Sequence, residues 1–387
     1  MTIKLYEQDA YRYTFTATVL SCEPCKKGFA VVLDQTAFFP EGGGQPADEG
    51  WIGNAPDKMS KVLDVQIDKS GVITHTTANP LEVGTAVHGN LNSVKRFFRM
   101  QNHTAEHLLS GFIHEAFGYD NVGFHLADDY VTLDVSGPLT EGDIVGLEEA
   151  VNMAVYANHE VYATYPTSEE LGALEYRSKL DLTEGVRLIT IEGCDVCACC
   201  APHVKRTGEI GVIKILDAIP YKGGTRITML SGMPAFQDYR MLHESNRANM
   251  RLLSAPREKV AEFVARDHDT ITALRAEIKA LSEQLASAQL EIVQTATAVC
   301  GFTKDASFDA LRSFAEQYRE DGKLCAMFSM SDDGNASYFL YVPEGGDIRD
   351  TVKAMNAAFA GKGGGKPHYA QGKLTATKEQ LTAFFES

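Results

Sequence analysis

The pattern of hydrophobic and polar positions changes character three times along the chain. As far as about residue 92, short runs rich in β-branched and aromatic residues, such as 12–20 and 29–34, lie between glycines. Runs of this kind predict short strands separated by turns, and several of them in succession favour a small barrel. We therefore predict a β-barrel domain over residues 1–92.

From residue 93 the apolar positions follow a helical period. Leu108, Phe112 and Phe117 lie at helix-like spacing, and Gly118 follows them as a predicted C-cap. Over about the next hundred residues, strand-like alternation of apolar and polar residues is interspersed with capping-box sequences that mark helix starts. Strands are predicted at 130–135, 186–191 and 211–216, and helix starts at 140–143 and 167–170. Helices and antiparallel strands in this order predict an α+β domain over residues 93–239.

Residues 240–297 carry a third pattern, a heptad repeat. Apolar residues recur at alternating spacings of three and four, at Ile271, Leu274, Ile278, Leu281, Leu285, Ala288 and Ile292. The repeat predicts a long helical arm that begins near Pro256. The apolar face of this repeat has two possible partners. It could pack against the helix before Pro256, giving a hairpin, or against a second copy of the chain, giving a coiled coil and a homodimer.

The last segment, residues 298–387, mixes helical and strand-like stretches. Helices are predicted at 308–314 and 349–360, and strands at 323–330 and 337–342. A glycine-rich stretch with two lysines follows at 361–372, and we predict a loop there. The predicted fold class is therefore α+β and multidomain: a small β-barrel, an α+β domain, a long helical arm and a small C-terminal α/β domain.

Composition and charge narrow the class of protein. At 387 residues, the chain is long enough for several domains, and 44% hydrophobic with 23% charged residues is typical of a globular protein. The start of the chain has no basic region followed by an apolar run, and no apolar stretch reaches membrane-spanning length. We therefore expect a cytoplasmic protein with no membrane partner. The net charge of -16 argues against a nucleic-acid partner unless a local basic patch binds phosphate.

Six of the eight cysteines are clustered, a pair at Cys22 and Cys25 and four from Cys194 to Cys200, while Cys300 and Cys325 stand alone. A large chain without a secretion signal keeps its thiols reduced, so clustering indicates metal binding rather than disulfides. One hypothesis joins Cys22 and Cys25 with Cys194 and Cys197 in a four-thiolate structural site. The alternative is that Cys22 and Cys25 are ordinary hairpin residues.

Two histidines on the predicted helix form a candidate metal clamp. His103 and His107 are four residues apart, which places them on one face of a helix, and neutral imidazole is a common zinc ligand. Downstream, Cys199 and His203 are separated by three residues, a spacing that lets both side chains reach one ion. Together the four residues predict a site for one zinc ion.

The clamp also fits a different enzyme. His103-x-x-Glu106-His107 matches the inverzincin metalloprotease pattern, in which Glu106 would act as general base. The Cys199 and His203 pair argues against this hypothesis, because it supplies two further ligands and leaves no need for a carboxylate.

Three consecutive glycines, Gly42, Gly43 and Gly44, stand before Gln45. Such a run lets the backbone approach a ligand and turn its N–H groups towards it. It is equally typical of a simple hairpin turn. The sequence leaves both interpretations open.

Taken together, these motifs resemble one family. The chain has Leu-Asp-x-Thr-x-Phe-Phe-Pro-Glu-Gly-Gly-Gly-Gln-Pro at 33–46, Asn-His-Thr-Ala-x-His-Leu-Leu at 102–109, Cys-x-x-x-His-Val at 199–204 and Arg-Thr-Gly-Glu-Ile at 206–210. In this order they resemble the long form of the AlaX alanyl-tRNA editing proteins and the editing domain of alanyl-tRNA synthetase. The tail Gly-Gly-Gly-Lys-Pro-x-x-Ala-Gln-Gly at 363–372 resembles the C-terminal domain of that synthetase.

The resemblance implies an aminoacyl-tRNA deacylase that hydrolyses tRNA(Ala) mischarged with serine, or in some members glycine. Editing is needed because an alanine pocket cannot exclude glycine by size and rejects serine only modestly. The resemblance implies zinc on His103, His107, Cys199 and His203, and catalytic roles for Thr36, Gln45, His103 and His107, with Thr36 at the serine hydroxyl. The substrate-binding residues that it implies are Gly42, Gly43, Gly44, Lys205, Arg206, Gly363, Gly364, Gly365, Lys366 and Gln371.

The chain departs from the family pattern in one place. Where the family commonly has two glycines and a threonine between the metal cysteine and histidine, this chain has Cys200, Ala201 and Pro202. Cys200 is therefore a competitor of Cys199 for the ion. Whether zinc activates water or positions the terminal ribose stays open at this point.

The tRNA partner requires local positive charge on an acidic chain. The candidates are Lys95, Arg96, Arg99, Lys205, Arg206, Lys362 and Lys366. A non-catalytic tRNA-binding module with the same motifs is an alternative to the deacylase. A homodimer through the helical arm or the C-terminal domain is a separate hypothesis.

Overall fold

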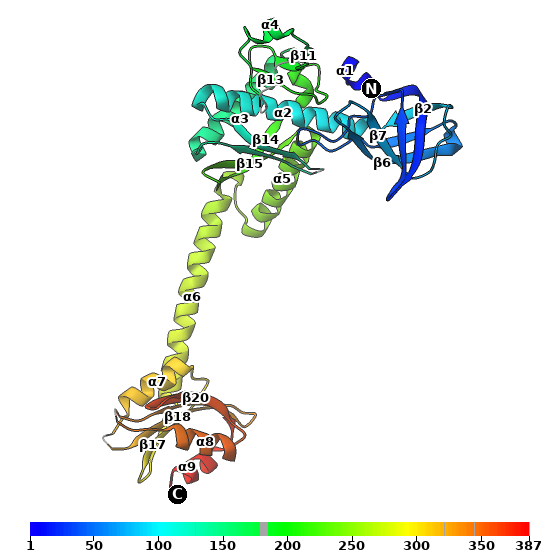
Figure 1. Ribbon diagram of the computed structural model, residues 1–387. Coiled ribbons are helices and arrows are strands. Elements are labelled where there is room, and N and C mark those ends of the chain that lie inside the picture. The colour runs from blue at the N-terminus through cyan, green and yellow to red at the C-terminus, as the bar shows by residue number, and fades with distance from the viewer. Residues whose placement is uncertain (128, 179–184, 321, 344, 387) are drawn as a thin grey trace. The chain divides into compact units, whose positions relative to one another are not determined.

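The computed structural model describes the chain except for residues 128, 179–184, 321, 344 and 387 (Figure 1). It divides into two compact units, Met1–Ser245 and Asn246–Ser387. The division of these units into four domains at residues 92, 239 and 297 stays a prediction.

The barrel predicted at the N-terminus is present. In barrel order its strands are β2 (Thr14–Cys25), β3 (Gly28–Leu33), β7 (Ile73–Thr77), β6 (Met59–Ile67), β5 (Gly50–Gly53) and β8 (Ala86–Leu91). Outside the barrel sheet, β1 (Ile3–Lys4) pairs in parallel with β4 (Gln35–Thr36), next to the short helix α1 (Leu5–Gln8), and the 3-10 turn η1 (Pro56–Lys58) leads into β6. Along β2, buried Phe15, Ala17 and Val19 alternate with more exposed residues, because successive side chains of a strand point to opposite faces.

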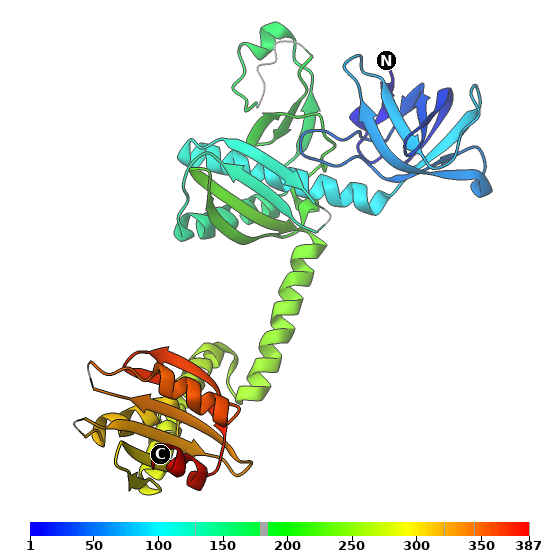
Figure 2. The ribbon, with the colours of Figure 1, turned by 60° about the horizontal axis from the view of Figure 1, so that its bottom comes forward.

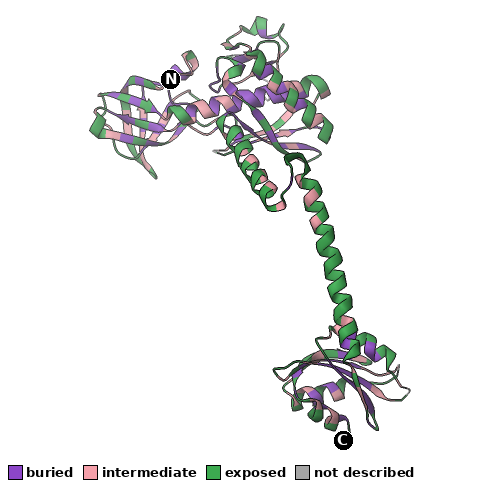
Figure 3. Ribbon diagram, turned by 180° about the vertical axis from the view of Figure 1, so that it is seen from behind, coloured by how far each residue is buried: buried purple, intermediate pink, exposed green. Residues whose placement is uncertain are grey.

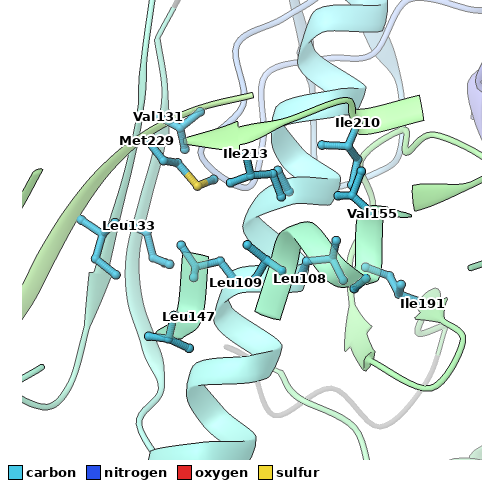
Figure 4. Packing of buried hydrophobic residues seen from close by; sticks show 14 of the residues in the cluster. Leu108, Leu109, Val131, Leu133, Leu147, Val155, Ile191, Ile210, Ile213 and Met229 are labelled. Atoms are coloured by element: carbon cyan, nitrogen blue, oxygen red, sulfur yellow. The ribbon is translucent and has the colours of Figure 1, made fainter. Parts of the chain in front are cut away.

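Helix α2 (Ser93–Phe117) joins the barrel to the rest of the first unit (Figure 2). It begins where the Asn92 side chain accepts a hydrogen bond from the backbone N–H of Lys95, and it ends at Gly118, whose φ of 68° is easily reached by glycine. The C-cap prediction is confirmed. Leu108 and Leu109 on this helix pack into the main core of the unit (Figure 4).

The described residues of the α+β part of the first unit form two sheets. The four-stranded sheet has the order β14 (Ile213–Tyr221), β15 (Gly224–Ser231), β10 (Val131–Val135) and β9 (Asn121–Leu126). The three-stranded sheet has the order β11 (Val161–Thr164), β12 (Leu188–Ile191) and β13 (Asp195–Ala198). Helix α3 (Glu141–Ala157) packs beside α2. The short helix α4 (Ser168–Leu171) and the 3-10 turn η2 (Thr207–Ile210) also belong to this unit, and α5 (Met233–Leu253) begins in it and runs past its end at Ser245. Both predicted capping boxes, at Thr140 and Thr167, are formed.

The second unit is built on a six-stranded sheet. Its order is β16 (Glu291–Gln294), β17 (Ala298–Lys304), β18 (Leu324–Met330), β19 (Asn335–Tyr341), β21 (Tyr369–Thr375) and β20 (Lys362–Lys366), with β17 and β18 parallel and the other neighbours antiparallel. Helices α7 (Phe308–Gln317), α8 (Arg349–Ala358) and α9 (Lys378–Glu386) pack against this sheet through two clusters of buried residues. The predicted small α/β domain is confirmed.

The glycine-rich stretch of the second unit corrects one prediction. Residues 362–366 form the edge strand β20 rather than a loop. A Cβ atom on Gly363 would lie 2.3 Å from Oη of Tyr338, and one on Gly365 would lie 2.1 Å from the carbonyl oxygen of Tyr369. The glycines therefore permit close strand pairing, which outweighs their low strand propensity.

The predicted long helix is α6 (Val260–Ala288), preceded by the 3-10 turn η3 (Arg257–Lys259). It is shorter than the heptad pattern predicted, because Ile292 lies in β16 and pairs with Gly301 of β17. Most of α6 is exposed (Figure 3), including Ile278 and Leu281 of the apolar repeat. No helix in the described part of the chain is long and apolar enough to cross a membrane.

Candidate metal centre

Four side chains from distant parts of the first unit converge on one point. His103 and His107 project from one face of α2, Cys199 follows β13, and His203 lies four residues beyond it. Their potential ligand atoms all lie within 4.8 Å of one another. The three histidines are buried, and Cys199 is partly buried. The residues predicted to hold a metal ion are therefore brought together.

The spacing of these atoms suits zinc. Sγ of Cys199 lies 3.6 Å from Nε2 of His103 and 3.4 Å from Nε2 of His203. A tetrahedral zinc ion with bonds of about 2.3 Å to sulfur and 2.0–2.1 Å to nitrogen would hold such atoms about 3.6 Å apart. Cys200, the predicted competitor, is exposed and stands outside this group of four. The geometry therefore favours Cys199.

The other ring nitrogen of each histidine faces a polar partner. Nδ1 of His103 lies 2.8 Å from Oε1 of Gln45, and Nδ1 of His203 lies 3.0 Å from Oγ1 of Thr104. Nδ1 of His107 lies 3.3 Å from Oδ2 of Asp195. Partners of this kind set the orientation of ligand histidines and select their tautomer.

Thr104 shows how the tautomer is selected. Its hydroxyl donates to the carbonyl oxygen of Met100 at 2.8 Å, so its oxygen can only accept from His203. Nδ1 of His203 must then carry the proton, which leaves a lone pair on Nε2. That lone pair faces Sγ of Cys199, where a metal ion would bind.

Burial and neighbouring charge set the ionisation of the donors. Burial alone would raise the pKa of the Cys199 thiol, but the neighbouring imidazole of His103, together with a hydrogen bond from His107, outweighs it and holds that pKa well below its usual value. Burial lowers the pKa of His203 to about 3, so this ring is neutral at pH 7. A thiolate beside neutral imidazole is a donor set that zinc prefers.

The glycine run forms a tight turn that delivers Gln45 to this group. Gly42 and Gln45 exchange two backbone hydrogen bonds of 3.0 and 3.1 Å, and Gly43 and Gly44 between them have φ values of 59° and 81°. Two successive positive φ values are typical of a type I′ turn. Gly44 also packs against Phe124, where a Cβ would lie 2.4 Å from the carbonyl oxygen. A cavity of about 470 Å³ lies beside the turn, lined by Gly42–Pro46, Glu41, Gln66 and His125.

Thr36 lies in the core of the barrel and is fully buried. Nδ1 of His75 lies 3.3 Å from the carbonyl oxygen of Val31 and must donate to it, so Nε2 of His75 accepts the Thr36 hydroxyl at 2.8 Å. The Thr36 oxygen also accepts from the backbone N–H of Phe38. Its hydroxyl proton is thus directed to His75, and a role in binding serine stays a prediction.

Two of the predicted basic contacts are structural. Arg96 is fully buried and forms an ion pair with Asp48, and it also donates to the carbonyl oxygens of Ala10 and Ala37. Arg99 is 3% exposed and donates to the carbonyl oxygen of Ala47. The suggestion that Arg96 and Arg99 contact tRNA is therefore wrong, because both are enclosed where α2 meets the barrel.

The remaining basic candidates lie at the surface. The Lys205 side chain is 65% exposed and lies 3.3 Å from Asp9, and the Arg206 side chain is 46% exposed and lies 2.9 Å from Glu160. In the second unit, Gly363, Gly364, Gly365 and Lys366 of β20 and Gln371 of β21 are exposed. These residues are accessible to a partner.

The two alternatives based on motifs gain no support. Among the residues that the structure describes, no metal-competent group of histidines, cysteines or carboxylates contains Cys22, Cys25 or Cys194. Glu106 is likewise outside these groups, and its Oε1 accepts from Nδ2 of Asn121 at 2.5 Å. A thiolate stands where the metalloprotease hypothesis needs a carboxylate.

Comparison with protein families gives three matches along the chain. Residues 13–95 match the class II (A) tRNA synthetases, and residues 186–250 match the second additional domain of threonyl and alanyl tRNA synthetases. Residues 292–387 match the DHHA1 domain. The matches fall on the barrel, on the segment with Cys199 and His203, and on the C-terminal domain.

Individual relatives agree with these matches. The alanine–tRNA ligase of Halorubrum lacusprofundi is 32% identical over 394 residues, which cover 96% of this chain and 42% of that enzyme. The alanyl-tRNA editing protein Aarsd1 of Mus musculus is 25% identical over 401 residues, which cover 98% of this chain and 96% of that protein. The chain is thus similar to an alanyl-tRNA editing protein along almost its whole length and to part of alanine–tRNA ligases. It spans 42% of the length of the ligase and nearly all of Aarsd1.

A solved structure, the C-Ala domain of Aquifex aeolicus alanyl-tRNA synthetase, matches 25% of this chain and 99% of that domain, with 14% identity and a TM-score of 0.21.

Some residues of the site were not found from the sequence. Thr104 lies inside the histidine motif but was not assigned a role, and Asp195 lies inside the cysteine cluster. Arg177 and His75 had no sequence signal, because their roles come from contacts that only the fold creates.

Proposed function

We propose that this chain is a trans-acting, zinc-dependent aminoacyl-tRNA deacylase that hydrolyses Ser-tRNA(Ala), with Gly-tRNA(Ala) as a second candidate substrate. The observation that carries the proposal is the convergence of three imidazoles and one thiol beside the turn that holds Gln45. The names of the relatives support the choice of alanyl-tRNA as the system.

The reaction is the hydrolysis of an ester. Water adds to the ester carbonyl, the bond between the acyl carbon and the terminal ribose oxygen breaks, and the ribose oxygen takes a proton. The products are the free amino acid and uncharged tRNA. A zinc ion on His103, His107, Cys199 and His203 would supply a Lewis-acid centre next to the reacting ester.

Gln45 is the residue of the chain best placed to contact the ester. Its Oε1 faces Nδ1 of His103, while its Nε2 is buried and has no hydrogen-bond partner in the described part of the protein. A buried amide N–H₂ without a partner costs free energy until it finds an acceptor. A substrate carbonyl or ribose oxygen in the adjoining cavity would provide one.

Selection of serine is the proposed role of Thr36. Its hydroxyl donates to His75, so towards a substrate its oxygen can only accept. A serine side chain can donate such a hydrogen bond, and an alanine side chain cannot. Contact requires the barrel core to open locally when substrate binds, because Thr36 is fully buried in the free protein.

The proposed tRNA contacts are Lys205 and Arg206 near the metal group, and Gly363, Gly364, Gly365, Lys366 and Gln371 in the second unit. All are accessible, and local positive charge can bind phosphates on a protein of net negative charge. The exposed repeat on α6 is the proposed surface for a homodimer.

The test is deacylation of Ser-tRNA(Ala) by the zinc-loaded chain, with Gly-tRNA(Ala) and Ala-tRNA(Ala) in parallel. We expect rapid loss of the seryl ester and slow loss of the alanyl ester. Cys199→Ala should abolish zinc binding and lower the rate by at least about a thousandfold if the ion provides most of the catalysis. The matched control is Cys200→Ala, which removes the neighbouring exposed thiol and should keep both properties.

The rival hypotheses predict other results. A tRNA-binding module would bind Ser-tRNA(Ala) and leave its ester intact although zinc is present. A metalloprotease would cleave peptides and lose that activity in Glu106→Gln. Equal zinc content in wild type, His103→Ala and Cys199→Ala would refute the ligand set.

A further inference from the structure

One buried carboxylate beside the metal group has no part in the proposed hydrolysis. Asp195, at the start of β13, is 8% exposed, and its Oδ2 lies 3.3 Å from Nδ1 of His107. That nitrogen is itself buried and forms no hydrogen bond of standard geometry among the described residues, and the carboxylate at 3.3 Å is its polar contact. Asp195 is therefore the group that faces the non-ligating side of His107.

Arg177 holds Asp195 in this position. Its Nε donates to Oδ1 at 2.7 Å, and one of its terminal nitrogens donates to Oδ2 at 2.9 Å. The same terminal nitrogen donates to Oγ of Ser110 on α2 at 2.8 Å. The backbone of Arg177 bonds to β13 on both sides, through Val196 and Ala198. Two-point pairing of this kind fixes the plane of a carboxylate.

The glycine at position 111 of α2 makes room for the carboxylate. A Cβ atom there would lie 2.9 Å from Cβ and 3.1 Å from Oδ1 of Asp195. Glycine inside a helix costs about 1 kcal/mol relative to alanine. Gly111 lies one helical turn after His107, and the close packing of Asp195 against it explains why a glycine occupies this position.

A second metal ion is the competing explanation, since ligand atoms of His107, Asp195 and Cys197 also lie within 4.8 Å of one another. Arg177 argues against it. Its guanidinium already occupies both oxygens of Asp195 and would be placed against any cation bound there. The group is better explained as support for the first site.

We propose that Asp195, held by Arg177, is a positioning residue for His107: it keeps the proton on Nδ1 and directs Nε2 towards the metal ion. Arg177 thus acts on the metal centre through two intervening side chains. The inference rests on the proposed metal centre, and it is independent of which ester the centre hydrolyses.

The test measures metal binding in the full-length chain. Zinc affinity is determined by chelator competition for wild type, Asp195→Asn and Asp195→Ala, and the cobalt-substituted proteins are compared by visible absorption. Loss of such a partner typically weakens metal binding by about 10- to 100-fold. We expect Asn to lie between Asp and Ala, because its oxygen can still accept from His107 while its amide opposes Arg177. The cobalt spectrum should change as His107 loses its fixed orientation.

Two further variants separate positioning from folding. Asp134→Asn is the matched control, because Asp134 pairs with Arg226 in the same two-point geometry, at 2.6 and 2.7 Å, away from the metal group. Gly111→Ala keeps every charge and favours the helix, yet its methyl group would displace Asp195. We expect weaker zinc binding in Gly111→Ala and unchanged binding in Asp134→Asn.

The outcomes are distinct. If Asp195→Asn and Gly111→Ala match Asp134→Asn in zinc affinity and cobalt spectrum, the inference is wrong. A wild-type chain that binds no zinc overturns both the metal centre and the inference. Zinc binding that depends on Asp195 in a chain that leaves Ser-tRNA(Ala) intact would refute the proposed function alone.

Discussion

Helices α2 and α6 are both long, and both carry regularly spaced apolar residues, but their surroundings differ. Helix α2 buries apolar residues and also Arg96, Glu106 and both clamp histidines, whereas Ala286 is the residue of α6 that is buried. The apolar repeat of α6 leaves Ile278 63% and Leu281 57% exposed.

The difference teaches what a hydrophobic period can indicate. In both helices the period correctly predicts helix, because it reflects the 3.6-residue turn. It does not tell which surface the apolar face covers. The polar residues carry that information: a histidine or arginine that the fold buries needs a specific partner, and such partners mark the site in α2.

The largest expected effect is the loss of a buried charge on α2. Arg96→Leu removes the nearer of two buried ion-pair partners of Asp48 and leaves Arg99, 3.8 Å away, and removing one member of a buried pair typically costs up to about 3–5 kcal/mol. The free energy of unfolding is measured in denaturant through the fluorescence of Trp51, the single tryptophan, which lies in β5 of the barrel. Arg266→Leu is the control on α6, because Arg266 pairs with the exposed Asp267. Equal effects of the two variants would break the comparison.

The next effect concerns the apolar positions themselves. Leu108→Ala empties part of the main core of the first unit and should destabilise that unit by about 2–5 kcal/mol. Leu281→Ala on α6 should change stability by less than about 0.5 kcal/mol in a monomer, since it is an exposed site. Thermal unfolding followed by circular dichroism distinguishes them. A larger, concentration-dependent effect of Leu281→Ala would show that a second chain covers the α6 repeat.

The third prediction concerns pH. Burial lowers the pKa of His75 from 6.5 to about 4, so the unfolded chain binds a proton in this interval that the folded chain does not. Stability of the barrel should therefore fall as the pH is lowered from 6.5 to 4, by roughly 3 kcal/mol in total. Denaturant midpoints by Trp51 fluorescence give the slope, which should flatten in His75→Gln. His268→Gln on α6, where the side chain is 79% exposed, should leave the slope unchanged.

Much of the fold follows from local rules. The first two barrel strands, β2 and β3, the end of α2 at Gly118 and the capping boxes at Thr140 and Thr167 depend on residues close together in the chain, and they were predicted correctly, as was the barrel as a whole. Ile292 was misplaced because an apolar residue in register with a heptad also fits a strand. The glycines of β20 were misplaced because the role of Gly363 depends on the side chain of Tyr338, which lies on β19, two strands away in the same sheet.

The metal group shows where sequence reasoning ends. The four ligand residues have a recognisable spacing, and the structure brings them together. The residues that support these ligands have no recognisable spacing in the sequence. Gln45 is 58 residues from His103, and Thr104 is 99 residues from His203. A glutamine, a threonine or an aspartate gains such a role only through packing, since each is common and has no spacing of its own to reveal it.

Arg96, which pairs with Asp48, and His103, which faces the metal group, lie on the same uninterrupted helix α2, about two turns apart. This fixes their relative phase. Inserting one residue between them would rotate the clamp by about 100° relative to the barrel, and inserting seven would restore the rotation but lengthen the helix by about 10 Å. Surface loops generally tolerate insertions, whereas the stretch of α2 between Arg96 and His103 has to keep its number of residues.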